Sequence, residues 1–195
     1  MTYRNRPAVL ALSCLGAVLM TGCTPNPAAS HPSPQPSEST SLPGSPSPTA
    51  TQSAGPPQRP VAADGLTLAA AEAFVRHYVE LLNYSYSTGD PGPLLAASDP
   101  GCVGCKGIGD YVRKVNGTNG GLTGDYKDTL MNVTEIFRGT AGRAGGSATI
   151  KSGSYVERAT PGASPLPQTG RTGTMQFTLS SAAGRWVMYE MELKE

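Results

Sequence analysis

The sequence predicts an α+β protein in which N-terminal helices pack on a curved, mostly antiparallel sheet, after a disordered tether. Three observations lead to this prediction. An apolar run and then a stretch rich in Pro, Ser and Thr occupy roughly the first third of the chain. Helical periodicity follows, and alternating strand patterns come only after it. Helices that precede the strands, instead of alternating with them, are typical of the α+β class.

Composition narrows the possible functions. The 195 residues suffice for one domain or two small ones, and they carry a formal net charge of only +1. That charge gives no basic field of the kind that binds nucleic acid or an acidic membrane surface. No P-loop, dinucleotide-binding glycine pattern or Ser-His-Asp spacing is present. We therefore expect no cofactor and no nucleic-acid partner.

Residues 1–22 are predicted to be a lipoprotein signal peptide. Two arginines precede the apolar run of residues 7–20, which is too short to cross a bilayer but fits the core of a signal peptide. The run ends in Met-Thr-Gly-Cys, which resembles the lipobox of bacterial lipoproteins, although Met20 stands where Leu is usual. The thiol of Cys23 would carry the lipid. An ordinary secretory signal, with Cys23 incidental, is the alternative.

Residues 23–61 are predicted to be a lipid-anchored, disordered linker. Pro, Ser and Thr dominate it, so it cannot bury enough apolar surface to offset its ordering entropy. As a flexible coil it would span roughly 30–40 Å. We expect it to hold a domain of residues 62–195 away from the cell membrane, on the extracytoplasmic face, with the membrane as a partner through the lipid.

The first predicted helix covers residues 66–87. Thr67 can cap its N-terminus, and Gly89 ends it. Its apolar residues form one stripe at a period of 3.6: Ala71, Phe74, Tyr78, Leu81 and Leu82. Asn83 lies opposite this stripe and should face water.

Two shorter helices are predicted next. Asp90, before Pro91, can cap a short helix around residues 93–98. The following helix carries Ile108, Val112 and Val115 at helical spacing, and the glycines of NGTNGG stop it.

Strand patterns begin after residue 121. Residues 129–139 alternate in part, with Met131, Val133 and Phe137 on one face. Residues 147–159 form a second strand with a glycine interruption, and a loop rich in Pro and Gly follows over residues 161–173.

A C-terminal hairpin ends the chain. Its first strand, residues 174–180, puts Met175, Phe177 and Leu179 on one face. Its second strand, residues 185–195, has four apolar residues that alternate with polar ones and should share a face: Val187, Tyr189, Met191 and Leu193. Gly184 suits the positive φ of the turn between them.

The run AEAFVRHYVELLNYSYSTGDPGPLLAASDPGCVGC, residues 71–105, resembles a family of actinobacterial lipoproteins with a domain of unknown function, number 6318. The lipobox and the tether match the layout of that family. The order of helices and strands is similar to that of the nuclear-transport-factor-2-like cone fold. The family implies no activity, and the cone fold is shared by enzymes and by purely structural domains.

The sequence CVGC, with Cys102 and Cys105, permits three interpretations. At a helix N-terminus the pair could be redox-active, because the helix dipole lowers the pKa of a thiol. However, no strand leads into it as in thioredoxins, and thiols outside the cytoplasm tend to stay oxidised. A zinc site needs about four ligands, and only His77 offers itself as a third. A structural disulfide is favoured and no metal is expected, with thiol–disulfide exchange as the alternative.

His77 and the aromatic residues are the remaining candidates. His77 could be the base of a small cone-fold enzyme, or a partly buried, hydrogen-bonded side chain. A pocket could include Tyr78, His77 and Trp186, with Tyr84, Tyr86 and Tyr126 nearby, although the same aromatic residues could fill the core. We assign no catalytic residue. The expected function is non-catalytic binding of a small hydrophobic molecule or of an envelope protein.

Overall fold

The structure, a computed structural model, describes residues 55–194. The predicted signal peptide, Cys23 and most of the predicted linker lie outside the described residues. The helices of the described part come first in the chain: η1 (Val61–Ala63), α1 (Leu68–Thr88), α2 (Gly92–Ala96) and α3 (Val103–Gly117). None of these helices is both long enough and apolar enough to cross a membrane.

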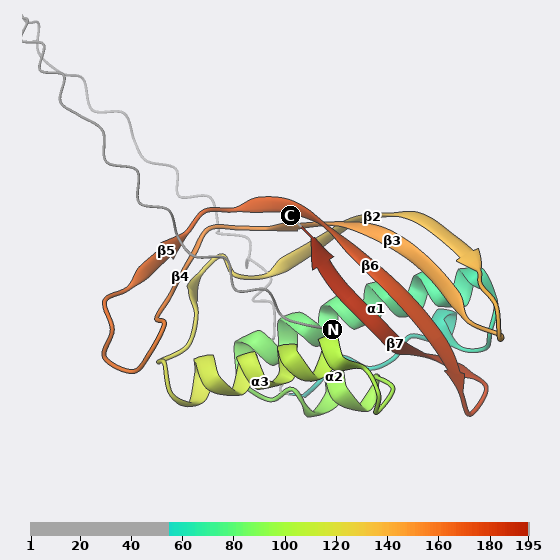
Figure 1. Cartoon of the computed structure of the whole chain (residues 1–195), viewed down its shortest axis with the longest axis horizontal. Coiled ribbons are helices and arrows are strands. Elements are labelled where there is room, and N and C mark those ends of the chain that lie inside the picture. The colour runs from blue at the N-terminus through green and yellow to red at the C-terminus, as the bar shows by residue number, and fades with distance from the viewer. Residues whose placement is uncertain (1–54, 195) are drawn as a thin grey trace, which may run out of the picture. The chain divides into compact units, whose positions relative to one another are not determined.

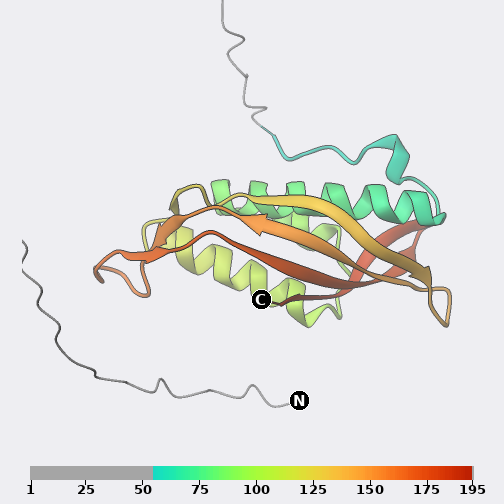
Figure 2. The ribbon, with the colours of Figure 1, turned by 90° about the horizontal axis from the view of Figure 1, so that it is seen from above.

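The strands form two antiparallel sheets (Figure 1). The larger has the order β2 (Asp128–Arg138), β3 (Ala144–Ser152), β6 (Arg171–Ala182), β7 (Arg185–Lys194). The smaller has the order β1 (Thr123–Gly124), β4 (Tyr155–Glu157), β5 (Leu166–Gln168). The large sheet arches over the helices, and Figure 2 shows the same arrangement from above. This is the predicted α+β fold class.

The cap, the glycine end and the buried face of α1 are as predicted, although the helix itself is Leu68–Thr88 and not residues 66–87. The Thr67 hydroxyl accepts a hydrogen bond from the Ala70 amide at 3.0 Å, and Gly89 ends the helix in the left-handed region with φ 76°. Every residue of the predicted apolar stripe is buried. The helix therefore supplies one side of the core, against α2 and the inner face of the large sheet.

The predicted core face of β2 is wrong in part. Met131 and Phe137 are 57% and 48% exposed, whereas Leu130, Val133 and Ile136 pack against the core. The reason is that β2 contains two register shifts against β3, between Leu130 and Asn132 and between Val133 and Glu135. Each bulge adds a residue, so the inward positions recur every three residues instead of every two.

The predicted face of β7 is also wrong in part. Trp186 and Met188 are fully buried, not Val187 and Tyr189, although Met191 is buried as expected. Thr178 pairs with Glu190 and Leu179 with Met188, so Tyr189 has no partner on β6. This bulge reverses which residues face inward along the strand.

The glycine interruption in the second predicted strand is a bend between the two sheets. β3 ends at Ser152 and β4 begins at Tyr155, and the hairpin of β4 and β5 continues the hairpin of β3 and β6 (Figure 1). A Cβ at Gly153 would lie 2.0 Å from the Asp125 carboxylate. Glycine at this bend therefore leaves room for the loop between β1 and β2, which carries Asp125. β5 lies in the segment predicted to be a loop.

Ordered contacts begin before residue 62, within the predicted linker. The Arg59 guanidinium donates to the carbonyl oxygens of Ala63 at 2.9 Å and of Trp186 at 3.1 Å. It also lies over the Phe74 ring, 4.7 Å from its centroid. The chain is therefore attached to the domain from Arg59 onward.

Candidate functional site

A cavity of about 120 Å³ lies where β3 bends into β4. Its walls come from the inner face of the large sheet, the C-terminal end of α1, α3 and the loop before β2. Four of its side chains are tyrosines: Tyr86, Tyr111, Tyr126 and Tyr155. Leu122, Ile150 and Leu193 add apolar surface, and Asp128, Ser152 and Arg171 add polar groups. Aromatic and apolar walls that hold a few placed polar groups are typical of small-molecule sites.

The register of the large sheet places the three polar residues in one row. Asp128 pairs with Ser152, and Ser152 pairs with Arg171, so the side chains lie next to one another on the same face. Burial raises the pKa of Asp128 to about 6, and the charge of Arg171 partly opposes this rise. Asp128 can therefore gain or lose a proton near neutral pH and can donate or accept a hydrogen bond.

Asn83 positions the backbone of Asp128. Its side-chain amide donates to the Asp128 carbonyl at 2.8 Å and accepts from the Asp128 amide at 2.7 Å. The prediction that Asn83 faces water is therefore wrong, because the loop before β2 returns to α1 at this residue. The pair of hydrogen bonds joins the end of α1 to the start of β2.

Hydrogen bonds to Glu157 of the smaller sheet hold the side of the cavity that α3 and β4 form. The Tyr111 hydroxyl donates to one oxygen of Glu157 at 2.6 Å, and the Gln168 amide donates to the other at 2.9 Å. The Tyr86 and Tyr111 rings meet edge to face with centroids 6.3 Å apart. Burial raises the pKa of Tyr86 and, together with the Glu157 carboxylate, that of Tyr111. Both hydroxyls therefore stay protonated at neutral pH.

The structure places the predicted pocket residues elsewhere. Tyr78 and Trp186 are 0% exposed. The Tyr78 hydroxyl lies 2.8 Å from that of Ser98, and the Trp186 indole donates to the Thr67 carbonyl at 3.0 Å. Both rings are core residues. The sequence could not separate the two cases, because an apolar face of a helix or a strand has the same pattern whether it faces a core or a cavity. Of the aromatic residues considered from the sequence, Tyr86 and Tyr126 do line the cavity.

His77 is also buried in the core, at 4% exposure. Its Nδ1 lies 3.6 Å from the Glu80 carboxylate and has no hydrogen-bond partner among the described residues. Burial lowers the pKa of His77, while Glu80 acts in the opposite direction. The side chain is not among those that line the cavity.

Sequence reasoning missed Asp128 and Arg171. Arg171 falls in a segment predicted to be a loop, and Asp128 lies just before the strand that was predicted to begin at residue 129. Their proximity depends on the register of three strands, for which the chain offers no local signal.

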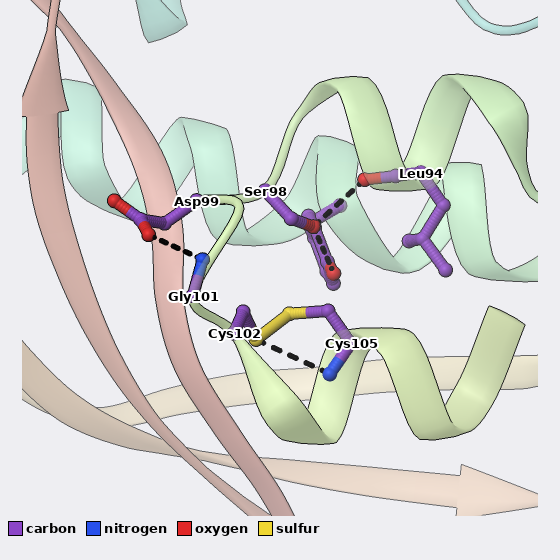
Figure 3. The surroundings of a disulfide bond; sticks show 7 residues. Leu94, Ser98, Asp99, Gly101, Cys102 and Cys105 are labelled. Atoms are coloured by element: carbon purple, nitrogen blue, oxygen red, sulfur yellow. Dashed lines mark hydrogen bonds between the residues drawn. A yellow bond between two sulfur atoms is a disulfide. The ribbon is translucent and has the colours of Figure 1, made fainter.

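Cys102 and Cys105 form the predicted disulfide, with Cα atoms 5.3 Å apart (Figure 3). Cys102 caps α3, since its sulfur accepts from the Cys105 amide at 3.2 Å. The two residues are 1% and 0% exposed, so a partner thiolate has no access to either sulfur. The disulfide closes the first turn of α3. Asp99 stabilises the connection between α2 and α3 by accepting from the Gly101 amide at 2.7 Å.

Over residues 55–194, no three His, Cys, Asp or Glu side chains gather as the ligands of a metal ion would.

Three comparisons place the chain among known proteins. The model of a family described as "Family of unknown function (DUF6318)" matches residues 47–192. A comparison with curated proteins gave no match. Among solved structures, the intermembrane space region of the chloroplast protein ARC6 is 18% identical with a TM-score of 0.51, over 66% of this chain and 96% of that one.

Other solved structures match less well. A protein described as a scytalone dehydratase from Novosphingobium aromaticivorans DSM 12444 is 13% identical, with a TM-score of 0.44, over 64% of this chain and 83% of that one. A protein described as a polyketide cyclase from Xanthomonas campestris pv. campestris is 12% identical, with a TM-score of 0.35, over 63% and 90%. At such identities the similarity to a solved structure concerns the fold alone.

Proposed function

The chain belongs to the family of unknown function DUF6318, and because membership names no activity, we propose from the geometry that its domain is a non-catalytic binding module. Its ligand is a small, largely apolar molecule with one polar group. The observation that carries this proposal is the cavity, in which four tyrosines surround a partly buried carboxyl, that of Asp128.

The walls determine the chemistry of the ligand. Tyrosine rings with Leu122, Ile150 and Leu193 favour an apolar ring or a short chain, because its burial removes apolar surface from water. Asp128 and Arg171 can orient a hydroxyl, amide or amine group. A volume of about 120 Å³ is of the order that holds a single small ring.

Binding without catalysis is supported by what accompanies Asp128 in the cavity. The Asp128 carboxyl can exchange a proton near neutral pH, but no described histidine or cysteine lines the cavity beside it as a second proton-transfer group or as a nucleophile. His77 lies in the core, and the disulfide of Cys102 and Cys105 is buried.

The membrane location is part of the same proposal. The lipobox-like sequence before Cys23 and the Pro-rich linker support a domain anchored by lipid on the extracytoplasmic face. We expect Cys23→Ser to remove lipid labelling and to release the chain from the membrane fraction. A Cys23→Ser chain that is still lipid-labelled and membrane-bound would show that the anchor is elsewhere.

Ligand binding is tested with small probes on the full chain: p-cresol, benzylamine and 1-hexanol. Methyl NMR shifts of Leu122, Ile150 and Leu193 report occupation of the cavity. Ser152→Leu adds a side chain on the inner face and should abolish the shifts. Ser147→Leu is the matched control, since it makes the same change on the outer face of the same strand. Absence of shifts with all three probes, or equal binding by both variants, would refute the proposal.

A further inference from the structure

The outer face of the large sheet carries a groove of about 410 Å³. The helices lie against the opposite face (Figures 1 and 2), and no other element of residues 55–194 covers this one. Pairing across β2, β3, β6 and β7 gives two rows of residues in the groove. One row is Glu135, Ser147, Gln176 and Glu192, and the other is Phe137, Gly145, Thr178 and Glu190.

These two rows point away from the core. The row between them contains Phe177 and Met191, which are 4% and 5% exposed on the inner face. Because successive side chains of a strand point to opposite faces, the rows on either side of it project outward.

Small residues on the middle strands create the hollow. Gly145 and Ser147 on β3 form part of the floor of the groove. Side chains on β2 and on β7 form its two walls, and three ordinary strand spacings put these two strands about 14 Å apart. A Cβ at Gly145 would lie 3.0 Å from the tip of the Phe137 ring, so the glycine lets this ring lie over β3. The ring is 48% exposed and offers an aromatic surface beside the floor of the groove.

All charged residues that line the groove are acidic: Glu135, Glu190 and Glu192. Lys194, further along β7, pairs with Glu192 at 3.2 Å and donates to Gln176 at 2.6 Å. Within the described part of the chain, the carboxylates of Glu135 and Glu190 form no hydrogen bond or ion pair. Their charges are therefore available to a partner.

We propose that this groove docks a basic segment of a partner protein. A guanidinium group can stack on the Phe137 ring while its N–H groups bind the Glu135 carboxylate. Glu190 lies in the same row as Phe137, on the opposite side of the groove, so it can bind a second basic side chain of an extended segment that crosses the groove. A second copy of this chain is a poor occupant, since its carboxylates would face these carboxylates.

The test uses the full chain and a fluorescein-labelled peptide in which three arginines alternate with glycines. Fluorescence polarisation at low salt measures the affinity. We expect Glu135→Gln with Glu190→Gln to weaken binding about tenfold, and Phe137→Ala to weaken it several-fold. The matched control is Glu72→Gln with Glu80→Gln on α1, which removes the same charge from the other side of the sheet. It should change the affinity less than about twofold.

Four results would overturn the proposal. The first is that the arginine peptide does not bind at low salt, and the second is that a peptide with glutamates in place of the arginines binds equally well. The third is that the α1 control weakens binding as much as the groove variant, which would mean a nonspecific attraction. The fourth is that sedimentation shows a dimer that Phe137→Ala dissociates, which would assign the groove to a second copy. Ser152→Leu fills the cavity on the inner face and should leave peptide binding unchanged. The peptide experiment therefore tests the groove separately from the proposed ligand cavity.

Discussion

Replacement of Gly104 by alanine tests how closely α3 packs on β7. A Cβ at Gly104 would lie 2.2 Å from the Met191 carbonyl oxygen and 3.3 Å from its carbon. Both are backbone atoms, so no side chain can rotate to make room. The start of α3 would have to move by roughly 1 Å to restore an ordinary contact distance. Gly104 lies between Cys102 and Cys105, so their disulfide constrains the turn that would have to adjust.

The expected magnitude follows from two opposing effects. Overpacking at a buried contact costs about 1–3 kcal/mol, and replacement of a helical glycine by alanine gains up to about 1 kcal/mol. We expect a net loss of about 1–2 kcal/mol in the free energy of unfolding for Gly104→Ala. Gly107 is the matched control, since it lies in the same helix and a Cβ there would meet nothing within 4 Å. Gly107→Ala should gain about 0.5–1 kcal/mol.

Urea unfolding measures both variants. Trp186 is the only tryptophan of the chain and is 0% exposed, so its fluorescence reports loss of the core. The two variants should differ by about 1.5–3 kcal/mol, because only Gly104→Ala meets a clash. Equal stability of Gly104→Ala and Gly107→Ala would refute the close approach of α3 to β7.

Two further predictions concern Asp128 and the disulfide. Burial raises the pKa of Asp128 to about 6, above its value in the unfolded chain, so the folded state binds this proton more tightly. The free energy of unfolding should therefore fall as pH rises from about 4 to about 6, and Asp128→Asn should be more stable than the wild type by about 2–3 kcal/mol at pH 7 but not at pH 4. Urea unfolding at both pH values checks this, and an equal difference at each would contradict it. Cys102→Ala with Cys105→Ala should lower the free energy of unfolding by about 2 kcal/mol, from the entropy of the four-residue loop. In the folded wild type, the mass shift on alkylation should show slow reduction by dithiothreitol, whereas rapid reduction would favour thiol–disulfide exchange.

Local patterns in the sequence were sufficient for the helices and for the order of the elements. The cap of α1 at Thr67, its end at Gly89 and its buried stripe each depend on residues within a few positions of one another. The disulfide of Cys102 and Cys105 is equally local, because four residues at a helix start bring the two sulfurs together. The α+β class follows from the same short-range information, since it needs only the order of helix and strand patterns.

The tertiary structure decided which strand residues face inward and which residues share a site. Bulges in β2 and β7 reverse the alternation, so Phe137 faces solvent and Trp186 enters the core. Pairing across β2, β3 and β6 brings Asp128 beside Arg171, although the two lie far apart in the chain. The physical reason is the same in both cases. A strand specifies its own alternation, but its register depends on backbone hydrogen bonds to distant strands, and one extra residue changes every face beyond it.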